Sequence, residues 1–204
     1  MPRTSARGGP QTRARILAVA TSLFLERGYD PVTVAEIARE AGVSSVTVFN
    51  HFPRKEDLFL DRVDDAHEFL RAAIRDRAPD TDALASLEAL TYRLADDKHP
   101  LSGLNDRSVT FFRTVAGSPA LIARARELAA DLQQTLTSEL TQDPTFKGDP
   151  ALLSAFFIAG YTTVLVETAR HRIAESPSAT TPANHRRRLN QLFTHLREGT
   201  FPSQ

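Results

Sequence analysis

Apolar positions in the first part of the chain recur at the three- and four-residue spacing of an amphipathic helix. Five apolar residues share one face of the first predicted helix: Ile16, Leu17, Ala20, Leu23 and Phe24. Gly28 follows them, and glycine commonly ends a helix by adopting a left-handed conformation. No stretch of the chain alternates apolar and polar residues as a half-buried strand does. We therefore predict a first helix that ends close to residue 28.

Two short helices are predicted next. Thr33 and Glu36 have the spacing of a capping box, in which two side chains satisfy the first free amides of a helix. Gly42 supplies a sharp stop, and Ser44 is a suitable N-cap for a third helix that runs through Phe52. Two short helices joined by a tight turn form a helix-turn-helix, whose second helix fits the major groove of DNA.

The rest of the chain keeps the helical pattern. Pro53 breaks the third helix, and a long fourth helix is expected to begin near Lys55. Prolines and glycines separate five further predicted helices, over residues 83–95, 104–116, 119–140, 150–174 and 182–196, with a loop at 175–181. The sequence predicts an all-α fold of about nine helices, in which a three-helix DNA-binding domain precedes a larger helical domain.

Charge is divided unevenly along a chain whose formal net charge is zero. Residues 1–55 contain eight Lys and Arg and four Asp and Glu, a net charge of +4, which leaves −4 for the remaining 149 residues. A basic N-terminal segment is typical of nucleic-acid binding. The chain has no cysteine, which excludes disulfides, thiolate zinc sites and cysteine nucleophiles. We expect no metal and no cofactor.

No segment predicts export or membrane insertion. The first 15 residues are basic but lack the following apolar stretch of a secretory signal. The most apolar run, residues 151–166, would span roughly 24 Å as a helix, less than the ~30 Å hydrocarbon core. We expect a cytoplasmic protein without a membrane partner, in which this run is buried inside the protein or at a subunit interface.

The segment TVAEIAREAGVSSVTVFNHFPRKEDLF, residues 33–59, resembles the signature of the TetR family of bacterial repressors. The resemblance covers about residues 12–60, because it continues upstream in Arg15, Ile16, Leu17, Ala20, Phe24 and Gly28. It implies a flexible basic arm over residues 1–11, a DNA-binding domain over 12–54 and an effector-binding and dimerisation domain over 55–204. It also implies a function: a ligand-responsive transcriptional repressor, and no enzyme, that binds a near-palindromic operator as a homodimer and is released by a small-molecule effector.

The resemblance implies nine DNA-binding residues: Thr33, Ser44, Ser45, Val46, Thr47, Phe49, Asn50, His51 and Lys55. Arg54 departs from the family, which often has a capping serine or asparagine there, and as a cation it is a tenth candidate, for a phosphate contact. Hydroxyls and helix-terminal amides donate to phosphate oxygens, and Asn50 can pair with an adenine edge. Phe49 stands where the family usually has tyrosine, so it would contact a sugar or a thymine methyl group instead of a phosphate. The alternative interpretation is structural: an N-cap role for Ser44, and packing for Thr47 and Phe49.

Two further basic groups lie outside this segment. The resemblance implies a basic arm that touches the DNA backbone, with Arg3, Arg7, Arg13 and Arg15 before or at the start of the first helix. A solvated tail is the alternative. The run HRRRL, residues 185–189, is interpreted as the polar face of a dimer helix and not as a second nucleic-acid site.

For the C-terminal domain, the resemblance implies that the last two long helices pair with those of a second copy in a four-helix bundle. The sequence agrees, because residues 150–174 are apolar around the helix and Leu189, Leu192, Phe193 and Leu196 form a stripe. The resemblance also implies an effector pocket, for which seven aromatic residues are candidates: Phe69, Tyr92, Phe111, Phe112, Phe156, Phe157 and Tyr161. The same residues equally fit an ordinary core.

Two other classes of function fit parts of the sequence. A cluster of carboxylates and imidazole at helical spacing can bind a metal, and such residues occur at Asp61, Asp64, Asp65, His67 and Glu68. No second Glu-x-x-His element accompanies them, which disfavours a helical metal-binding enzyme. A DNA-binding regulator without a ligand, constitutive or architectural, stays open as an alternative, and the sequence encodes neither the effector nor the operator.

Overall fold

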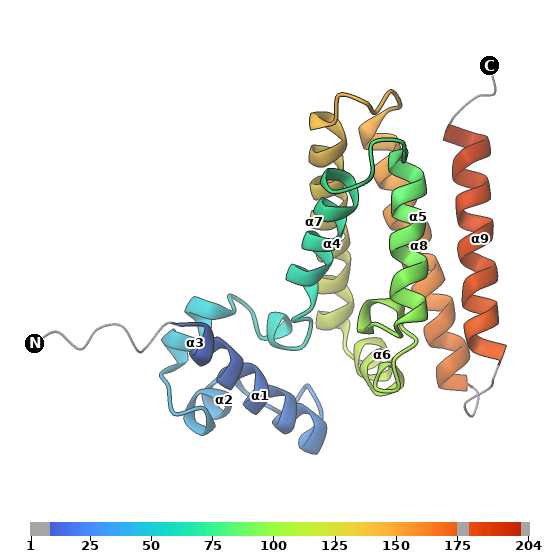
Figure 1. Cartoon of the computed structure of the whole chain (residues 1–204). Coiled ribbons are helices and arrows are strands. Elements are labelled where there is room, and N and C mark those ends of the chain that lie inside the picture. The colour runs from blue at the N-terminus through green and yellow to red at the C-terminus, as the bar shows by residue number, and fades with distance from the viewer. Residues whose placement is uncertain (1–8, 175–179, 201–204) are drawn as a thin grey trace, which may run out of the picture. The chain divides into compact units, whose positions relative to one another are not determined.

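The structure is a computed structural model that describes residues 9–174 and 180–200. Over these residues the chain forms nine α-helices, two short 3-10 helices and no strand (Figure 1), which confirms the predicted all-α class. The helices are α1 (Pro10–Arg27), α2 (Val34–Glu40), α3 (Ser45–His51), η1 (Lys55–Leu58), α4 (Val63–Arg75), α5 (Ala83–Asp96), η2 (Pro100–Ser102), α6 (Ser108–Gly117), α7 (Pro119–Gln142), α8 (Pro150–Ala174) and α9 (Thr180–Thr200).

The chain divides into two compact units. The N-terminal unit comprises residues 1–61 and 114–124, and the C-terminal unit comprises residues 62–113 and 125–204. The boundary predicted after residue 54 instead lies after residue 61, because Leu58 of η1 is buried in the same apolar cluster as α1, α2 and α3. Leu121, near the start of α7, belongs to that cluster as well.

The core of the N-terminal unit is built from the face that the sequence pattern predicted. Ile16 and Ala20 of α1 are fully buried, and Leu23 and Phe24 nearly so, while Leu17 packs at the edge. The other buried members of this cluster are Tyr29, Val32, Ile37, Ala38, Ala41, Val48, Phe52, Leu58 and Leu121. Because α2 and α3 each bury one side against α1, their outer sides are left to solvent.

The predicted continuous fourth helix is wrong. Lys55–Leu58 is a 3-10 helix, and turn residues separate it from α4, which begins at Val63. Three consecutive residues, Leu58, Phe59 and Leu60, all pack against the N-terminal core. A straight α-helix would point three consecutive side chains in widely different directions, so the chain bends here instead.

The predicted helix over residues 104–116 also begins later, at Ser108. The side-chain oxygen of Asn105 accepts a hydrogen bond of 3.0 Å from the backbone amide of Arg107. Such a local side-chain bond offers the backbone an alternative to the helix, so residues 105–107 form a turn before α6. Of the predicted loop at 175–181, residues 175–179 lie outside the described residues, and 180 and 181 belong to α9.

In the C-terminal unit α9 packs along α8 and α5, and α5 packs against α4 (Figure 1). The main apolar cluster unites these helices with α7 and includes Leu87, Leu136, Leu153, Phe157 and Phe193. The α8 and α9 backbones approach closely at Gly160, where an added Cβ atom would lie 2.3 Å from a methyl carbon of Leu192. Glycine at this position therefore sets how closely α9 can pack on α8.

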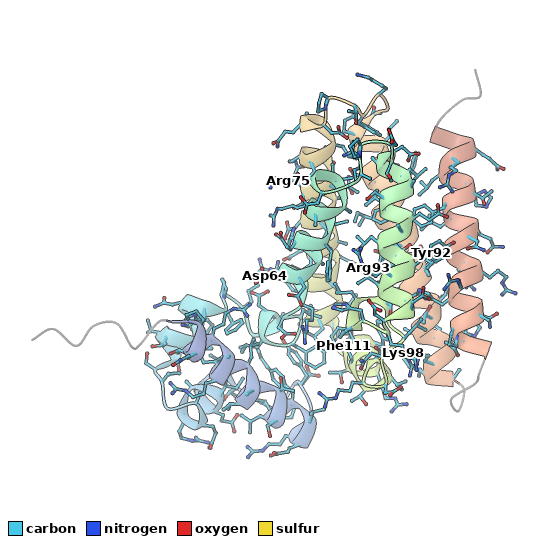
Figure 2. All side chains as sticks on the ribbon, viewed as in Figure 1. Asp64, Arg75, Tyr92, Arg93, Lys98 and Phe111 are labelled. Atoms are coloured by element: carbon cyan, nitrogen blue, oxygen red, sulfur yellow. The ribbon has the colours of Figure 1, made fainter. Side chains whose placement is uncertain are left out.

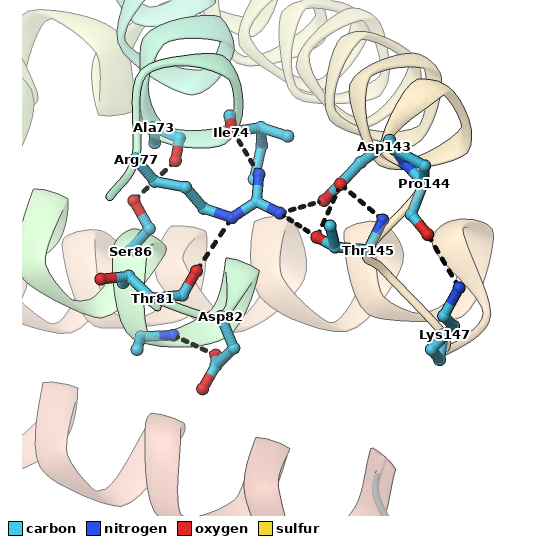
Figure 3. A network of polar contacts seen from close by, with 11 residues as sticks. Ala73, Ile74, Arg77, Thr81, Asp82, Ser86, Asp143, Pro144, Thr145 and Lys147 are labelled. Atoms are coloured by element: carbon cyan, nitrogen blue, oxygen red, sulfur yellow. Dashed lines mark hydrogen bonds and ion pairs between the residues drawn. The ribbon is translucent and has the colours of Figure 1, made fainter. Parts of the chain in front are cut away.

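One half-buried arginine joins the turn after α4 to the turn after α7 (Figure 3). The Arg77 guanidinium donates to the Ile74 carbonyl, to the Thr81 carbonyl at 3.0 Å, and to Asp143 and Thr145 at 2.5 and 2.6 Å. Burial alone would raise the pKa of Asp143, but the hydrogen bonds from Thr145 and Arg77 outweigh it and lower that pKa. The two turns are thus held at one end of the helical bundle.

Helix α8 extends beyond the apolar run at residues 151–166. It has 25 residues, and an 18-residue window with a mean hydropathy of 1.5 makes it the one described helix long and apolar enough to cross a membrane. Only 33% of that window is buried within the chain. Its apolar residues therefore divide between the core and an exposed side.

Candidate nucleic-acid interface

The start of α2 is fixed by the predicted capping box. The Thr33 hydroxyl oxygen accepts from the Glu36 amide at 3.2 Å, and a Glu36 carboxylate oxygen accepts from the Thr33 amide and hydroxyl, both at 2.8 Å. These hydrogen bonds from Thr33 lower the pKa of Glu36. The Thr33 hydroxyl, predicted to contact phosphate, thus already donates to a carboxylate.

The turn between α2 and α3 is a Schellman motif. The amide of Val43 donates to the Ala38 carbonyl at 2.9 Å, and the amide of Gly42 donates to the Arg39 carbonyl at 3.1 Å. Gly42 has a φ of +64°, the left-handed conformation that only glycine adopts without strain. This turn sets the angle at which α3 leaves α2.

Helix α3 is capped by Ser44, whose hydroxyl oxygen accepts from the Thr47 amide at 3.1 Å. The Ser44 and Thr47 hydroxyl oxygens are themselves 2.8 Å apart, so they share a hydrogen bond. Val48 and Phe52 anchor the inner side of the helix in the core. The N-cap role predicted as the alternative for Ser44 is therefore present, and Thr47 is half-buried.

The outer side of α3 carries the other predicted DNA-binding residues. Val46 is 68% exposed and Phe49 48% exposed, and Asn50 is also exposed. Ser45 and His51 are half-buried at the edges of this side. The outer side thus combines two apolar side chains with a carboxamide that has two donors and an acceptor.

Lys55 lies against the loop between α1 and α2. Its ammonium group donates to the carbonyls of Tyr29 and Asp30, at 2.7 and 3.1 Å, and sits 4.2 Å from the centre of the Tyr29 ring. Burial lowers the pKa of Lys55, although the nearby carboxylates oppose that shift. Two of its three N–H donors are therefore used inside the protein, and its predicted contact with phosphate stays a prediction.

Several contacts that brace this unit were not found from the sequence. The Arg13 guanidinium lies 4.8 Å from the centre of the Phe52 ring, at the end of α3. Arg124 of α7 donates to Asp57 of η1 at 2.8 Å, in an ion pair whose side chains are 18% and 17% exposed. Asp57 also accepts a hydrogen bond from the backbone amide of Arg54, and the side chain of Arg54 is exposed. The Arg124–Asp57 pair has no local sequence signal, since its partners are 67 positions apart.

The seven aromatic residues predicted for an effector pocket do not form one group. Phe157 is buried in the core and stacks on Tyr161 with ring centres 6.0 Å apart, and the Tyr161 hydroxyl donates to the Leu101 carbonyl. Phe156 is 53% exposed on the other side of α8. The remaining four are half-buried: Phe69, Tyr92, Phe111 and Phe112.

Contacts of these four residues also differ. The rings of Phe111 and Phe112 meet edge to face on α6. The ring centres of Phe69 and His99 are 5.2 Å apart. Tyr92 lies between α5 and α9 (Figure 2). It is hydrogen-bonded to Asn190 of α9 and covered by the Arg186 guanidinium. A small open hollow between α4 and α7 is lined by Arg71, Gln134, Thr135, Ser138 and Glu139, and thus by none of the predicted aromatic residues.

The carboxylate cluster of α4 is dispersed among other partners. Asp65 pairs with Arg62 at 3.0 Å, Glu68 lies 3.7 Å from Arg71, and His67 Nδ1 lies 2.8 Å from the Thr135 hydroxyl. Within residues 9–174 and 180–200, no three His, Cys, Asp or Glu side chains are grouped so that they could hold a metal ion.

A capped helix pair with a glycine turn and a solvent-facing second helix defines a helix-turn-helix DNA-binding protein. Residues 16–61 match the family model for bacterial regulatory proteins, tetR family. A curated relative, the HTH-type transcriptional regulator TcmR of Streptomyces glaucescens, is 27% identical over 158 residues, which are 73% of this chain and 69% of TcmR. Over residues 16–61 the chain thus matches the TetR family of bacterial regulatory proteins, and it is similar to the transcriptional regulator TcmR over most of its length.

Solved structures share the fold of the whole chain. A protein described as a TetR-family transcriptional regulator from Mesorhizobium loti is 18% identical with a TM-score of 0.58, and the match covers 95% of this chain and 98% of that one. Thermus thermophilus FadR, a TetR-family repressor solved with lauroyl-CoA, is 23% identical with a TM-score of 0.56, covering 94% and 98%. At these identities the comparison shows the fold alone.

Proposed function

We propose that this chain is a ligand-responsive transcriptional repressor of the cytoplasm, which binds a near-palindromic operator as a homodimer and is released by a small-molecule effector. The observation that carries the DNA-binding part is the outer side of α3, where Val46, Phe49 and Asn50 are exposed on a helix fixed by caps at its start and by the core on its inner side. Such a rigid, outward-facing helix suits readout of base edges in the major groove.

The DNA-binding proposal is tested by titrating a labelled duplex from the DNA that flanks the gene. Asn50→Ala removes the carboxamide and is expected to weaken binding by about 1–3 kcal/mol, the worth of a good bidentate base contact. Thr21→Ala, at an exposed position of α1, is the matched control and should leave binding unchanged. Equal binding by the Asn50 variant would remove this residue from the interface, and no binding by wild-type protein at low salt would refute the function.

The homodimer proposal rests on the exposed side of α8. Leu152, Phe156 and Val166 are 51%, 53% and 42% exposed, and Ala159 and Thr163 lie between them at the same helical spacing. An exposed stripe of mostly apolar residues is typical of a protein–protein interface. In a twofold dimer the same stripe would meet its own copy.

Sedimentation velocity tests the dimer. The wild-type protein is expected to sediment as a dimer, and Val166→Glu is expected to shift it to monomer, because the substitution would bury a charge at the interface. Leu25→Glu changes a more exposed apolar residue on α1, at 68%, and serves as the control. A monomeric wild-type protein would contradict the proposal.

The effector proposal is supported by the half-buried aromatic residues of the C-terminal unit and by the FadR complex, in which the same fold holds lauroyl-CoA. A preformed protein–DNA complex is titrated with a panel of amphipathic small molecules, lauroyl-CoA among them. Release of the DNA by one compound, weakened in Phe112→Ala, is the expected result. A panel in which no compound changes DNA affinity would favour the alternative of a regulator without a ligand.

A further inference from the structure

Helix α3 exposes an unusual pair of side chains for a surface that meets a polyanion. Val46 and Phe49 are 68% and 48% exposed, and among the described residues of the N-terminal unit Leu25 is the only other large apolar side chain so exposed. Positions 46 and 49 are three apart on a helix, so both side chains lie on one side of it. They form a small apolar surface on a helix of seven residues.

An apolar surface has one favourable partner among the base edges of the major groove. Those edges present hydrogen-bond donors and acceptors, and the exception is the C5-methyl group of thymine. The side chain of Val46 has no polar atom, so it cannot hydrogen-bond a base or a phosphate. Facing the other base edges, it would cover groups that need hydrogen bonds.

The polar neighbours on α3 fit the same type of base pair. Asn50 is exposed next to Phe49, and a carboxamide pairs with the N6 and N7 atoms of adenine. The Ser44 and Thr47 hydroxyls are occupied with each other and with the helix cap. The exposed chemistry of α3 is thus methyl-binding and adenine-binding, which together describe an A·T pair.

The charge of the segment argues for DNA as the occupant of this surface. Residues 1–55 carry a net charge of +4 in a chain of zero net charge, which suits a phosphate backbone on either side of the helix. The excess positive charge comes from residues outside α2 and α3, among them Arg13, Arg15 and Lys55, and it favours a polyanion over a neutral protein surface as the occupant.

We propose that Val46 and Phe49 contact thymine C5-methyl groups, so that each operator half-site carries thymine opposite the start and middle of α3. This inference rests on the proposed function, since it requires that α3 enters the major groove.

The experiment compares thymine with uracil, which lacks only the C5-methyl group. A duplex that the full-length protein retains from a random-sequence pool is synthesised with uracil at every thymine and then at one position at a time. We expect the affinity to fall about fourfold for each contacted methyl group, because burying one such group is worth ~0.8 kcal/mol. The positions that respond should lie within the half-sites.

Two variants connect the methyl groups to the side chains. Val46→Ala and Phe49→Ala should bind the thymine duplex more weakly and should each lose part of the difference between thymine and uracil duplexes. Leu25→Ala, an exposed apolar residue of α1, is the matched control and should keep the full difference. All three changes are at exposed positions, and thermal unfolding checks that each variant is folded.

The possible results distinguish failure of the methyl contact from failure of DNA binding. Equal binding of the thymine and uracil duplexes, or a full difference that persists in both α3 variants, would overturn the methyl contact and leave DNA binding intact. Failure to retain any duplex would refute the proposed function and the methyl contact with it.

Discussion

Lys55 holds two parts of the N-terminal unit together and is also one of the predicted DNA-binding residues. Its ammonium group bonds the carbonyls of Tyr29 and Asp30 while its backbone begins η1. A lysine in this position can position the loop between α1 and α2 and still direct a third N–H towards a phosphate. The two roles make different predictions for one substitution.

We expect Lys55→Ala to lower the free energy of unfolding by about 1–3 kcal/mol, because the part-buried Tyr29 carbonyl and the exposed Asp30 carbonyl lose a charged donor. Loss of a phosphate contact would also weaken binding to all sequences and flatten the slope of log affinity against log salt by about 0.9. Urea unfolding and salt-dependent DNA titrations measure the two effects, with Arg126→Ala at an exposed position of α7 as control. An unchanged unfolding free energy would contradict the structural role, and an unchanged slope the phosphate contact.

His185 of α9 is a buried base between α8 and α9. It is 1% exposed, and its Nδ1 lies 2.8 Å from the Thr168 hydroxyl, which itself donates to the Val164 carbonyl. The Thr168 oxygen therefore accepts from Nδ1–H, and Nε2 has no partner among the described residues. Burial lowers the pKa of His185 to about 4, because protonation would place an unpaired N–H in the core.

This pKa predicts a pH-dependent stability. The unfolded chain binds a proton near the ordinary value of 6.5, and the folded chain near 4, so the unfolded state holds more protons between these values. Stability is fully present above pH 6.5 and falls as the pH drops towards 4, by up to ~3 kcal/mol. Urea unfolding should show a weaker pH dependence in His185→Gln than in the wild type. The exposed His195→Gln is the control, and an unchanged profile in the His185 variant would contradict the prediction.

At the scale of helices and turns, two Schellman motifs differ in the residue that adopts the left-handed conformation. After α2 it is Gly42, and after α5 it is Lys98, with a φ of +46°. The Lys98 amide donates to the Ala95 carbonyl at 3.1 Å and the His99 amide to the Leu94 carbonyl at 2.9 Å, which matches the bonding at Gly42. A lysine there carries the strain of a left-handed L-residue.

We expect Lys98→Gly to raise the free energy of unfolding by roughly 0.5–1 kcal/mol, because glycine adopts the left-handed conformation without strain. Gly42→Ala is expected to lower it by about 1 kcal/mol for the opposite reason. Thermal and urea unfolding of the two variants should therefore move in opposite directions. A destabilised Lys98→Gly variant would show that the lysine side chain contributes more than its backbone costs.

The elements that sequence analysis predicted well depend on local chemistry. The capping box of Thr33 and Glu36, the Gly42 turn and the Ser44 cap all involve residues within a few positions of one another. The break before α4 and the late start of α6 depended on packing of Leu58 to Leu60 and on one Asn105 side chain, which periodicity does not encode.

At the scale of the whole molecule, the long-range contacts were beyond the sequence. Arg77 meets Asp143, and Arg124 meets Asp57, across 66 and 67 positions. No pattern in a single sequence distinguishes these arginines from solvated ones. A candidate DNA-binding site could still be assigned from the sequence, because its residues follow one another between Thr33 and Lys55, whereas the aromatic residues predicted for an effector come from several helices.

The division of charge and of apolar surface connects the proposals at this scale. In the proposed function, the basic N-terminal segment would direct α3 to DNA, and the exposed side of α8 would bind a second copy. A twofold dimer presents two copies of α3, so its DNA site should be symmetric.

The central claim is tested most directly by selecting duplexes from a random-sequence pool with the full-length protein and sequencing those retained. We expect a near-palindromic motif whose half-site centres lie roughly 34–36 Å apart or a multiple of that distance, which is one or more turns of the duplex. Retained duplexes that share no motif, or that share a single half-site bound by a monomer, would contradict it.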